Sequence, residues 1–344
     1  MPQTSVPDLI TIGGLTVDNV VAADGTLGLG QAGGNGAYAA IGALHWVKSV
    51  GLVSQAVASY PRGVLDRLIA GGVDPGGVLF TATDLHAGTW FFYKDNGDRD
   101  DRFQSAPEDL AAAGFPTDRL TLNQRADWHA HLAARHVEGA MGYAQFRVLH
   151  PLTPEQIPAR FWQARGMLLA PSGLAVMAAM LDRAPKEMVV IADPGWQLAR
   201  HTLADLAPIL KRLNAFLPSE VELRHFVPDT GIATALEVIA QQTSGTVAVK
   251  LGPRGVLVWD RARSQAVPVP SPNVTACDPT GAGDAFCGGF LAGLVETFDP
   301  VQAARFGALA ASRVVTRFGA DGALPVDRAA MRAALSRFPE DATA

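Results

Sequence analysis

The feature that most restricts the fold is a series of short, continuous apolar segments that alternate with helical segments. The apolar segments span residues 166–170, 188–192, 215–217, 246–250 and 256–259. Helical patterns occupy residues 174–183, 203–213 and 231–241 between them. Strands that are apolar on both sides and joined through helices form a mostly parallel sheet covered on both faces. The sequence therefore predicts a three-layer α/β/α sandwich.

The N-terminal part begins with the same pattern and then changes. Residues 9–12 and 49–53 read as buried strands, and residues 38–44 read as a helix. Residues 89–93 are strongly β-prone, and a hairpin-type turn follows at residues 95–98. We expect one domain over residues 1–340, with a small β lid formed by about 14–32 and 85–104. Residues 341–344 are expected to be a frayed tail.

Composition restricts the class of protein and its partners. The chain of 344 residues is 48% hydrophobic and 18% charged, as expected of a globular protein with a sizeable core. Its net charge of -5 argues against nucleic acid or an anionic membrane as the main partner. Two cysteines, Cys277 and Cys287, suggest reduced thiols in a cytoplasmic protein. No uncharged stretch approaches the roughly 20 residues that span a bilayer.

A glycine-rich segment, residues 278–286, precedes an apolar stretch that reads as a helix. Gly281 and Gly283 allow a tight turn and leave amide groups uncovered at a helix N-terminus, where an anion is favoured. Asp284 falls in the same first turn, where it could remove a proton from a hydroxyl that attacks a phosphoryl group. The alternative is that Asp284 only caps the helix.

Several other positions are expected to border the same site. Gly13, Asp193, Pro218 and Gly252 each come just after a predicted strand. Ligands of parallel α/β sheets bind at the carboxyl ends of the strands. We therefore expect these positions and the 278–286 segment to surround one cleft.

The segment DPTGAGDAFCGGF, from Asp278 onward, resembles the C-terminal signature of the ribokinase-like carbohydrate kinases, the pfkB family. The resemblance extends over about residues 8–325. It implies a ribokinase-like fold with a β lid, and ATP-dependent phosphorylation of a hydroxymethyl group of a sugar with Mg²⁺. The Walker motif GxxxxGK[ST] is absent from the sequence. A dinucleotide-dependent oxidoreductase would need GxGxxG after the first strand, and residues 13–16 do not supply it.

The resemblance assigns roles to the glycine-rich segment. It makes Asp284 the catalytic base, and it makes Gly281, Ala282 and Gly283 the anion hole that holds the transferring phosphoryl group. Electrostatic donors of this kind are often worth about 3 kcal/mol each in the barrier.

A monovalent cation site is also implied by the resemblance. Asp278 and Thr280 match positions that contact K⁺ in potassium-activated members, and carbonyl groups near Val314 and Gly319 would complete the site. Carbonyl ligands leave no side-chain pattern, so the sequence leaves the K⁺ dependence open.

The resemblance also assigns nucleotide-binding roles to residues between 219 and 255. Gly252 and Gly255 match the loop along ATP, and Lys250 could add positive charge beside it; the alternative for Lys250 is simple solvation. Glu222 matches the glutamate of an Asn-x-x-Glu motif that organises Mg²⁺ through water. Ser219 replaces the asparagine. The alternative for Glu222 is a helix-start carboxylate.

The acceptor side of the resemblance lies near the N-terminus. Asp18 matches the carboxylate that binds substrate hydroxyls, and Gly33, Gly34 and Asn35 belong to the sugar-binding loop. Many members carry asparagine where this chain has Tyr38, which leaves the substrate open. Tyr38 could stack on a ring, fill the space left by a smaller substrate, or only pack within its helix.

Two further functions stay open at this stage. A nucleoside kinase would share this chemistry and differ only in the acceptor pocket. A catalytically weak homologue that binds sugar or nucleotide would explain Tyr38 and Ser219. Lid strands of relatives can pair across a homodimer, and nothing in the sequence requires that arrangement.

Overall fold

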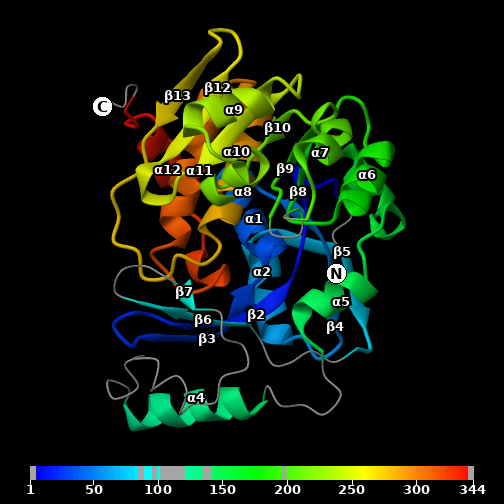
Figure 1. Cartoon of the computed structure of the whole chain (residues 1–344). Helices are drawn as coiled ribbons and strands as arrows, with labels where there is room; N and C mark the ends of the chain where they lie inside the picture. The colour runs from blue at the N-terminus through cyan, green and yellow to red at the C-terminus, as the bar shows by residue number, and fades with distance from the viewer. Residues whose placement is uncertain are drawn as a thin grey trace.

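Two separate sheets organise the molecule (Figure 1). The computed structural model describes residues 5–83, 89–94, 99–100, 121–134, 141–195, 198 and 200–339. Within these residues, one sheet has nine strands and the other has four. The expected mostly parallel sheet with helices, and the expected small separate sheet, are both confirmed.

The order in which the strands follow one another in the chain reverses at β1 of the large sheet. Its order is β13-β12-β11-β10-β9-β8-β1-β4-β5, and β1 pairs in parallel with both β4 and β8. Among the described strands of this sheet, only β11–β12 and β12–β13 pair antiparallel. The strands are β1 (Leu9–Ile12), β4 (Val50–Val57), β5 (Val73–Thr81), β8 (Gly166–Leu169), β9 (Val189–Ala192), β10 (Ala215–Phe216), β11 (Thr246–Lys250), β12 (Val256–Asp260) and β13 (Gln265–Val269). The switch between β1 and β8 is where ligands bind in sheets of this kind.

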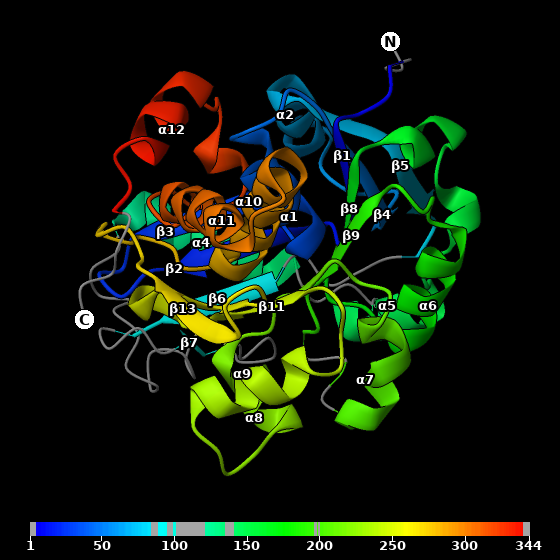
Figure 2. The ribbon, with the colours of Figure 1, turned by 90° about the horizontal axis from the view of Figure 1, so that it is seen from above.

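Helices cover both faces of the large sheet (Figure 2). One face carries α1 (Asn35–Leu44), α2 (Arg62–Gly71), α10 (Ala282–Thr297), α11 (Pro300–Val314) and α12 (Arg328–Leu335). The other face carries α6 (Leu174–Arg183), α7 (Leu203–Leu210), α8 (Glu220–Phe226) and α9 (Ile232–Ala240). None of the helices in the described parts of the chain is long and apolar enough to cross a lipid bilayer.

Alternating strand residues build a separate core under each helical layer. On β8, Leu168 packs in the core beneath α1, α10 and α11, whereas Met167 and Leu169 pack in the core beneath α6 to α9. Successive side chains of a strand point to opposite faces, so continuous apolar strands are required here. This is the physical reason that the sequence pattern identified the sandwich.

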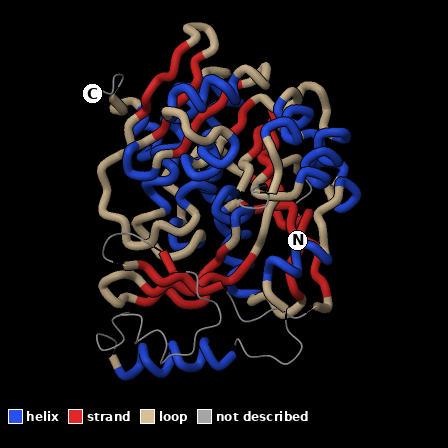
Figure 3. Tube along the Cα trace, in the orientation of Figure 1, coloured by secondary structure: helices blue, strands red, loops and turns tan. Residues whose placement is uncertain are grey.

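The small sheet forms the lid and has the order β3-β2-β6-β7 (Figure 3). Its strands are β2 (Thr16–Val21), β3 (Leu27–Gly33), β6 (Thr89–Tyr93) and β7 (Arg99–Asp100). Helix α4 (Leu122–Ala134) lies across its outer side, and α5 (Tyr143–Leu149) lies beside the end of the large sheet. The predicted turn at residues 95–98, and residues 85–88 and 101–104 of the predicted lid, lie outside the described residues.

Two helices approach each other closely because glycines face each other's backbones. A Cβ atom at Gly288 of α10 would lie 1.9 Å from the carbonyl oxygen of Ala39, and one at Gly42 of α1 would lie 2.1 Å from that of Ala285. Both substitutions would force the helices apart. The close approach places the N-termini of α1 and α10 side by side at the same end of the sheet.

Some element boundaries differ from the sequence prediction. Helix α1 begins at Asn35 rather than at residue 38, because Gly34 takes a left-handed φ of 92° and ends the preceding strand just before it. Strand β5 was not predicted from the sequence. Its residues Leu79 and Phe80 are exposed at the edge of the sheet, so its pattern is not that of a buried strand.

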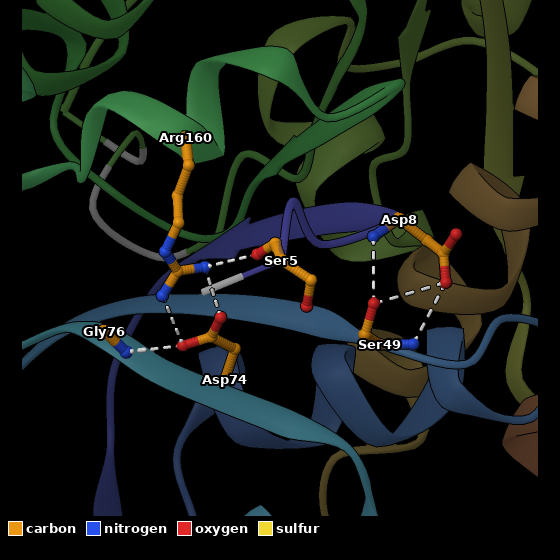
Figure 4. A network of polar contacts seen from close by, with 6 residues as sticks. All are labelled: Ser5, Asp8, Ser49, Asp74, Gly76 and Arg160. Atoms are coloured by element: carbon orange, nitrogen blue, oxygen red, sulfur yellow. Dashed lines mark hydrogen bonds and ion pairs between the residues drawn. The ribbon is translucent and has the colours of Figure 1, made fainter. Parts of the chain in front are cut away.

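Polar groups tie the N-terminal segment to the large sheet near the amino ends of β1 and β5 (Figure 4). Arg160, in the short helix η3 (Ala159–Gln163), pairs with the buried Asp74 of β5 and donates to the carbonyl of Ser5. The Asp8 carboxylate accepts hydrogen bonds from the amide groups of Lys48 and Ser49. These charges are used in holding the fold together.

Candidate active site

The N-terminus of α10 presents backbone donors that have no partner among the described residues. Gly281 takes a left-handed φ of 72° before the first helical residue, Ala282. Among the described residues, the amide groups of Gly281 and Gly283 make no hydrogen bond, whereas that of Ala282 donates to the carbonyl of Pro279 at 3.2 Å. The predicted anion hole therefore has open donors at Gly281 and Gly283, and the Ala282 amide is already used within the turn.

Asp284 lies in the first turn of α10 with its carboxylate free of hydrogen bonds to the described residues. It is half-buried rather than turned into the interior. Its pKa is raised to about 7, mainly by burial and then by the negative charges of Asp193 and Glu222, while the Lys250 ammonium opposes the rise. A carboxylate with this pKa can accept a proton near neutral pH.

A buried ion pair lies directly beneath these donors. The ammonium of Lys250, at the end of β11, donates to the carboxylate of Asp193, just past β9, at 2.5 Å. The same carboxylate accepts a hydrogen bond from the thiol of Cys287 at 3.3 Å. A Cβ atom at Gly283 would lie 3.6 Å from the Lys250 ammonium. Asp193 raises the pKa of Lys250, so that the ammonium keeps its charge beside the first turn of α10.

Asp193 is a site residue that the sequence did not assign to a role. Its only sequence signal is its position just past a predicted strand. Both cysteines are free, as expected, and Cys287 is buried. Lys250, the partner of Asp193, lies 57 residues further along the chain, so no local motif joins these two charged residues.

The loop before α10 is held by the carboxylate of Asp278, which is fully buried. Its two oxygens accept hydrogen bonds from the amide groups of Thr280, at 2.9 Å, and Gly319, at 3.2 Å. The carbonyl of Val315 accepts two more, from the amide groups of Cys277 and Asp278. The 278–281 loop and the 314–319 turn are therefore side by side, as the cation prediction required. The carbonyl of Val314 instead accepts the amide of Arg317.

Ser219 and Glu222 form a reciprocal cap at the start of α8. The Ser219 hydroxyl accepts the amide of Glu222, and a Glu222 carboxylate oxygen accepts the amide of Ser219 at 2.6 Å. The second oxygen of Glu222 has no hydrogen-bond partner among the described residues. Within those residues, no group of three or more His, Cys, Asp or Glu side chains is arranged to hold a metal ion. Glu222 therefore both caps the helix and leaves one oxygen available.

The predicted nucleotide loop presents an open face. Gly252 and Gly255 take left-handed φ values of 61° and 90°. A Cβ atom at Gly252 would meet nothing within 4 Å, whereas one at Gly255 would strike the carbonyl oxygen of Val269. Gly255 is thus required by the turn, and Gly252 leaves space beside the backbone.

The predicted acceptor residues gather where β1, β2 and α1 meet. Asp18 is buried, accepts the Thr16 hydroxyl at 2.9 Å and packs directly against Gly33. Burial raises its pKa to about 7. The side-chain oxygen of Asn35 accepts the amide of Gly14, and the carbonyl of Gly14 accepts the amide of Gly36. These bonds join Gly13–Gly14 to Gly33–Gly36, and the two segments together are called the predicted acceptor loop below.

Tyr38 connects the acceptor side to the anion hole. Its ring lies against Gly281, where a Cβ atom would be 2.1 Å from the ring. Its buried hydroxyl makes no hydrogen bond with the described residues, although it lies close enough to Asp18 to lower the pKa of that carboxyl. Tyr38 therefore fills space between Asp18 and the 278–281 loop and leaves one donor open.

A buried hydrogen bond joins the lid to the 278–281 loop. The hydroxyls of Tyr93 on β6 and Thr280 are 2.8 Å apart.

We expect Tyr93→Phe to loosen the lid and to raise the KM for the acceptor about 5-fold, since a net hydrogen bond is worth about 1 kcal/mol. Steady-state kinetics would measure this. Tyr60→Phe is the control, because its hydroxyl bonds to the carbonyl of Thr16 and not to the loop. Equal effects of both variants would exclude a specific role of Tyr93.

Comparison with known proteins decides the family. The sequence model of the pfkB family of carbohydrate kinases matches residues 147–327, which is more than half of the chain. The chain belongs to the pfkB family. The acceptor loop and Asp18 lie before the matched range, so they rest on the fold and the geometry alone.

Curated relatives of this pfkB chain include kinases of two substrate classes. An uncharacterised sugar kinase of Archaeoglobus fulgidus is 35% identical over 39% of this chain and 52% of that protein. A cytidine kinase of Thermococcus kodakarensis is 27% identical over 47% of this chain and 59% of that protein. The chain thus spans about half of the length of these relatives.

Solved structures show the same fold over the whole chain. A protein described as a ribokinase II from E. coli, in complex with ATP and Mg²⁺, has a TM-score of 0.63 at 18% identity and covers 96% of this chain and 99% of its own. A nucleoside kinase of Burkholderia thailandensis in complex with inosine has a TM-score of 0.66 at 17% identity, over 98% and 100%. At this identity they establish the ribokinase-like fold and no substrate.

Proposed function

We propose that this pfkB protein catalyses ATP-dependent phosphorylation of a hydroxymethyl group on a sugar or sugar-like acceptor. The observation that carries the proposal is the free carboxylate of Asp284 beside the open amide groups of Gly281 and Gly283. A proton acceptor and bare donors for a travelling negative group are the two elements that phosphoryl transfer needs.

In this mechanism, Asp284 takes the proton of the acceptor hydroxyl as its oxygen bonds to the terminal phosphorus of ATP, and the bond from that phosphorus to the bridging oxygen breaks to release ADP. The amide groups of Gly281 and Gly283 and the ammonium of Lys250 stabilise the negative charge that moves toward the acceptor. Asp193 holds Lys250 in place. The lid, docked through Tyr93 and Thr280, excludes water that would otherwise compete as acceptor.

ATP would lie along the open face of Gly252, with its terminal phosphate toward α10. Mg²⁺ keeps several waters and needs few protein oxygens, so the remaining oxygen of Glu222 suits it. When bound, Mg²⁺ would offset negative charge on the phosphates. A K⁺ ion beside the 278–281 loop is also part of the proposal, with Asp278, Thr280 and the adjacent carbonyls as its surroundings.

A nucleoside kinase is the second candidate, because nucleoside kinases are among the relatives and neighbours. Asp18 and the acceptor loop suit the hydroxyls of either class. The ring of Tyr38 already fills space between Asp18 and Gly281, which favours an acceptor without a bulky ring at that point.

The experiment is an ATP-consumption assay with Mg²⁺ over a panel of sugars, sugar acids, sugar phosphates and nucleosides, with product identification by mass spectrometry and NMR. A phosphate ester formed at a hydroxymethyl group would support the proposal. Failure of every acceptor to stimulate ATP consumption, despite measurable ATP binding, would favour a binding protein instead.

The pH dependence of the reaction follows from the raised pKa values of Asp284 and Asp18. Asp284 must be ionised to accept a proton, and its pKa is raised to about 7. We therefore expect kcat/KM to rise with pH and to level off above pH 7, with about a tenfold loss per pH unit below it. Asp18, also with a pKa of about 7, would steepen this limb. A flat profile between pH 5.5 and 8 would contradict the assignment, because an ordinary carboxyl stays ionised there.

A further inference from the structure

Arg147, on α5, reaches the end of the large sheet at the switch between β1 and β8. Its guanidinium donates to the Tyr143 hydroxyl at 3.0 Å, to the Ser172 hydroxyl at 3.2 Å and to the carbonyl of Pro171 at 3.4 Å. A Cβ atom at Gly14 would lie 3.1 Å from the Nη1 atom of Arg147 and 1.8 Å from the Tyr143 hydroxyl. The guanidinium therefore lies directly over the acceptor loop.

No carboxylate of the described residues balances the charge of Arg147. All three of its hydrogen bonds go to neutral oxygens, and no described residue forms an ion pair with it. Arg67 and Arg160, by contrast, each pair with a buried aspartate. Arg147 is half-buried, so the residue is partly accessible to solvent. A guanidinium held in place without a counter-charge is ready to bind a planar or tetrahedral anion.

The position of Arg147 separates it from the nucleotide. Pro171 and Ser172 follow β8, whereas Lys250 ends β11, three strands further along the sheet, and Gly252 follows it. Strands lie about 4.8 Å apart, so the two positions are separated by roughly 14 Å. The side of β1 that holds Asp18, Gly14 and Asn35 is the acceptor side. An anion at Arg147 would therefore belong to the acceptor rather than to ATP.

The charge of the cleft makes such a cation necessary for an anionic acceptor. Asp18, Asp278 and Asp284 surround the space around Tyr38, and Asp193 offsets Lys250. Arg99 of the lid also lies near Asp18 and lowers the pKa of that carboxyl. A neutral sugar would need no further positive charge in this cleft. The aspartates of the cleft would repel a bound anion unless another cation lay beside it.

We propose that Arg147 binds a carboxylate or phosphate group at the far end of the acceptor, so that the enzyme prefers sugar acids or sugar phosphates to neutral sugars. The inference rests on the proposed kinase function and names its substrate class. Tyr143 and Ser172 hold the guanidinium at the correct angle. The hydroxymethyl end of the same acceptor points toward Asp284.

Matched acceptor pairs test this proposal: D-gluconate against D-glucose, and D-fructose 6-phosphate against D-fructose. We expect the wild type to prefer the anionic member of at least one pair. Arg147→Met should lower kcat/KM for that anionic member about 30-fold, mainly through KM, because a hydrogen-bonded charge is worth about 2 kcal/mol. The neutral member should change less than about 3-fold. A preference within the gluconate and glucose pair would indicate a carboxylate acceptor, and one within the fructose 6-phosphate and fructose pair would indicate a phosphate acceptor.

Arg147→Lys keeps the positive charge but loses the planar guanidinium that can donate two parallel hydrogen bonds. It should therefore retain more activity toward the anionic member than Arg147→Met does. Arg165→Met is the control, because Arg165 precedes β8 at the opposite edge of the sheet. Preference for the neutral members, or equal losses on both members in Arg147→Met, would overturn the inference while leaving the kinase function intact. If Arg147→Met does not fold, Arg147→Lys carries the comparison.

Thermal shift with the same four compounds gives a readout that does not need turnover. The anionic members should stabilise the wild type and not Arg147→Met, and the absence of any such shift would overturn the inference. Failure of all acceptors in the ATP assay, with the shift still present, would instead reject the proposed kinase function.

Discussion

Asp284→Asn is expected to lower kcat about 10³-fold, the usual contribution of a positioned general base. Asparagine keeps the size of the side chain and removes the proton acceptor. The amide groups of Gly281 and Gly283 stay in place, so the affinity for ATP should change little. The melting temperature should stay the same or rise, because the negative charges of Asp193 and Glu222 no longer face a third.

The control for this variant is Asp205→Asn. Asp205 also lies in the first turn of a helix, where it caps α7 at the surface. It should leave kcat unchanged and lower the melting temperature slightly, since caps are worth about 1 kcal/mol. Stopped-flow or coupled ATP assays, together with calorimetric ATP binding, measure all of these effects. Retention of more than a tenth of the wild-type kcat by Asp284→Asn would remove the carboxylate from the mechanism.

Local patterns were enough to predict the frame of the site. Continuous apolar strands, each feeding two cores, gave the α/β/α sandwich, because side chains alternate between the faces of a strand. The 278–286 segment gave the start of α10 and the position of Asp284, because the glycines and the carboxylate lie within one helical turn. Those features depend on neighbouring residues, so the sequence displays them directly.

These local patterns could not predict contacts between residues that are far apart in the sequence. Asp193 meets Lys250 only because β9 and β11 end at the same edge of the sheet. Arg147 lies over Gly14 only because α5 crosses the switch between β1 and β8. Gly42 and Gly288 look like ordinary helix glycines until α1 and α10 are placed against each other. Each case needs the tertiary arrangement before the residue acquires a role.

The buried pair of Lys250 and Asp193 carries the second large prediction. The two side chains are only 12% and 5% exposed, so removing either partner leaves a charge or a polar group that solvent cannot stabilise. Lys250→Met and Asp193→Asn should each lower the free energy of unfolding by about 3 kcal/mol. The double variant should cost less than the sum, because it leaves no uncompensated charge.

Activity separates a role in catalysis from a role in stability alone. Lys250→Met should lower kcat about 10²-fold at a temperature where it is folded, because it removes a positive charge beside Gly283. Asp193→Asn should move the acid limb of the pH profile to lower pH, because a negative charge near Asp284 is lost. Lys250→Met should move it to higher pH. Shifts in the same direction would contradict the electrostatic link.

The exposed pair of Arg212 and Asp182 is the reference for the double-mutant cycle on Lys250 and Asp193. Their side chains are 39% and 72% exposed, so their coupling should stay below about 0.5 kcal/mol. Denaturant unfolding of both sets of variants measures the two coupling energies under the same conditions. If the buried pair couples no more strongly than this surface pair, Asp193 does not hold Lys250 in place, and the ammonium beside Gly283 loses its physical support.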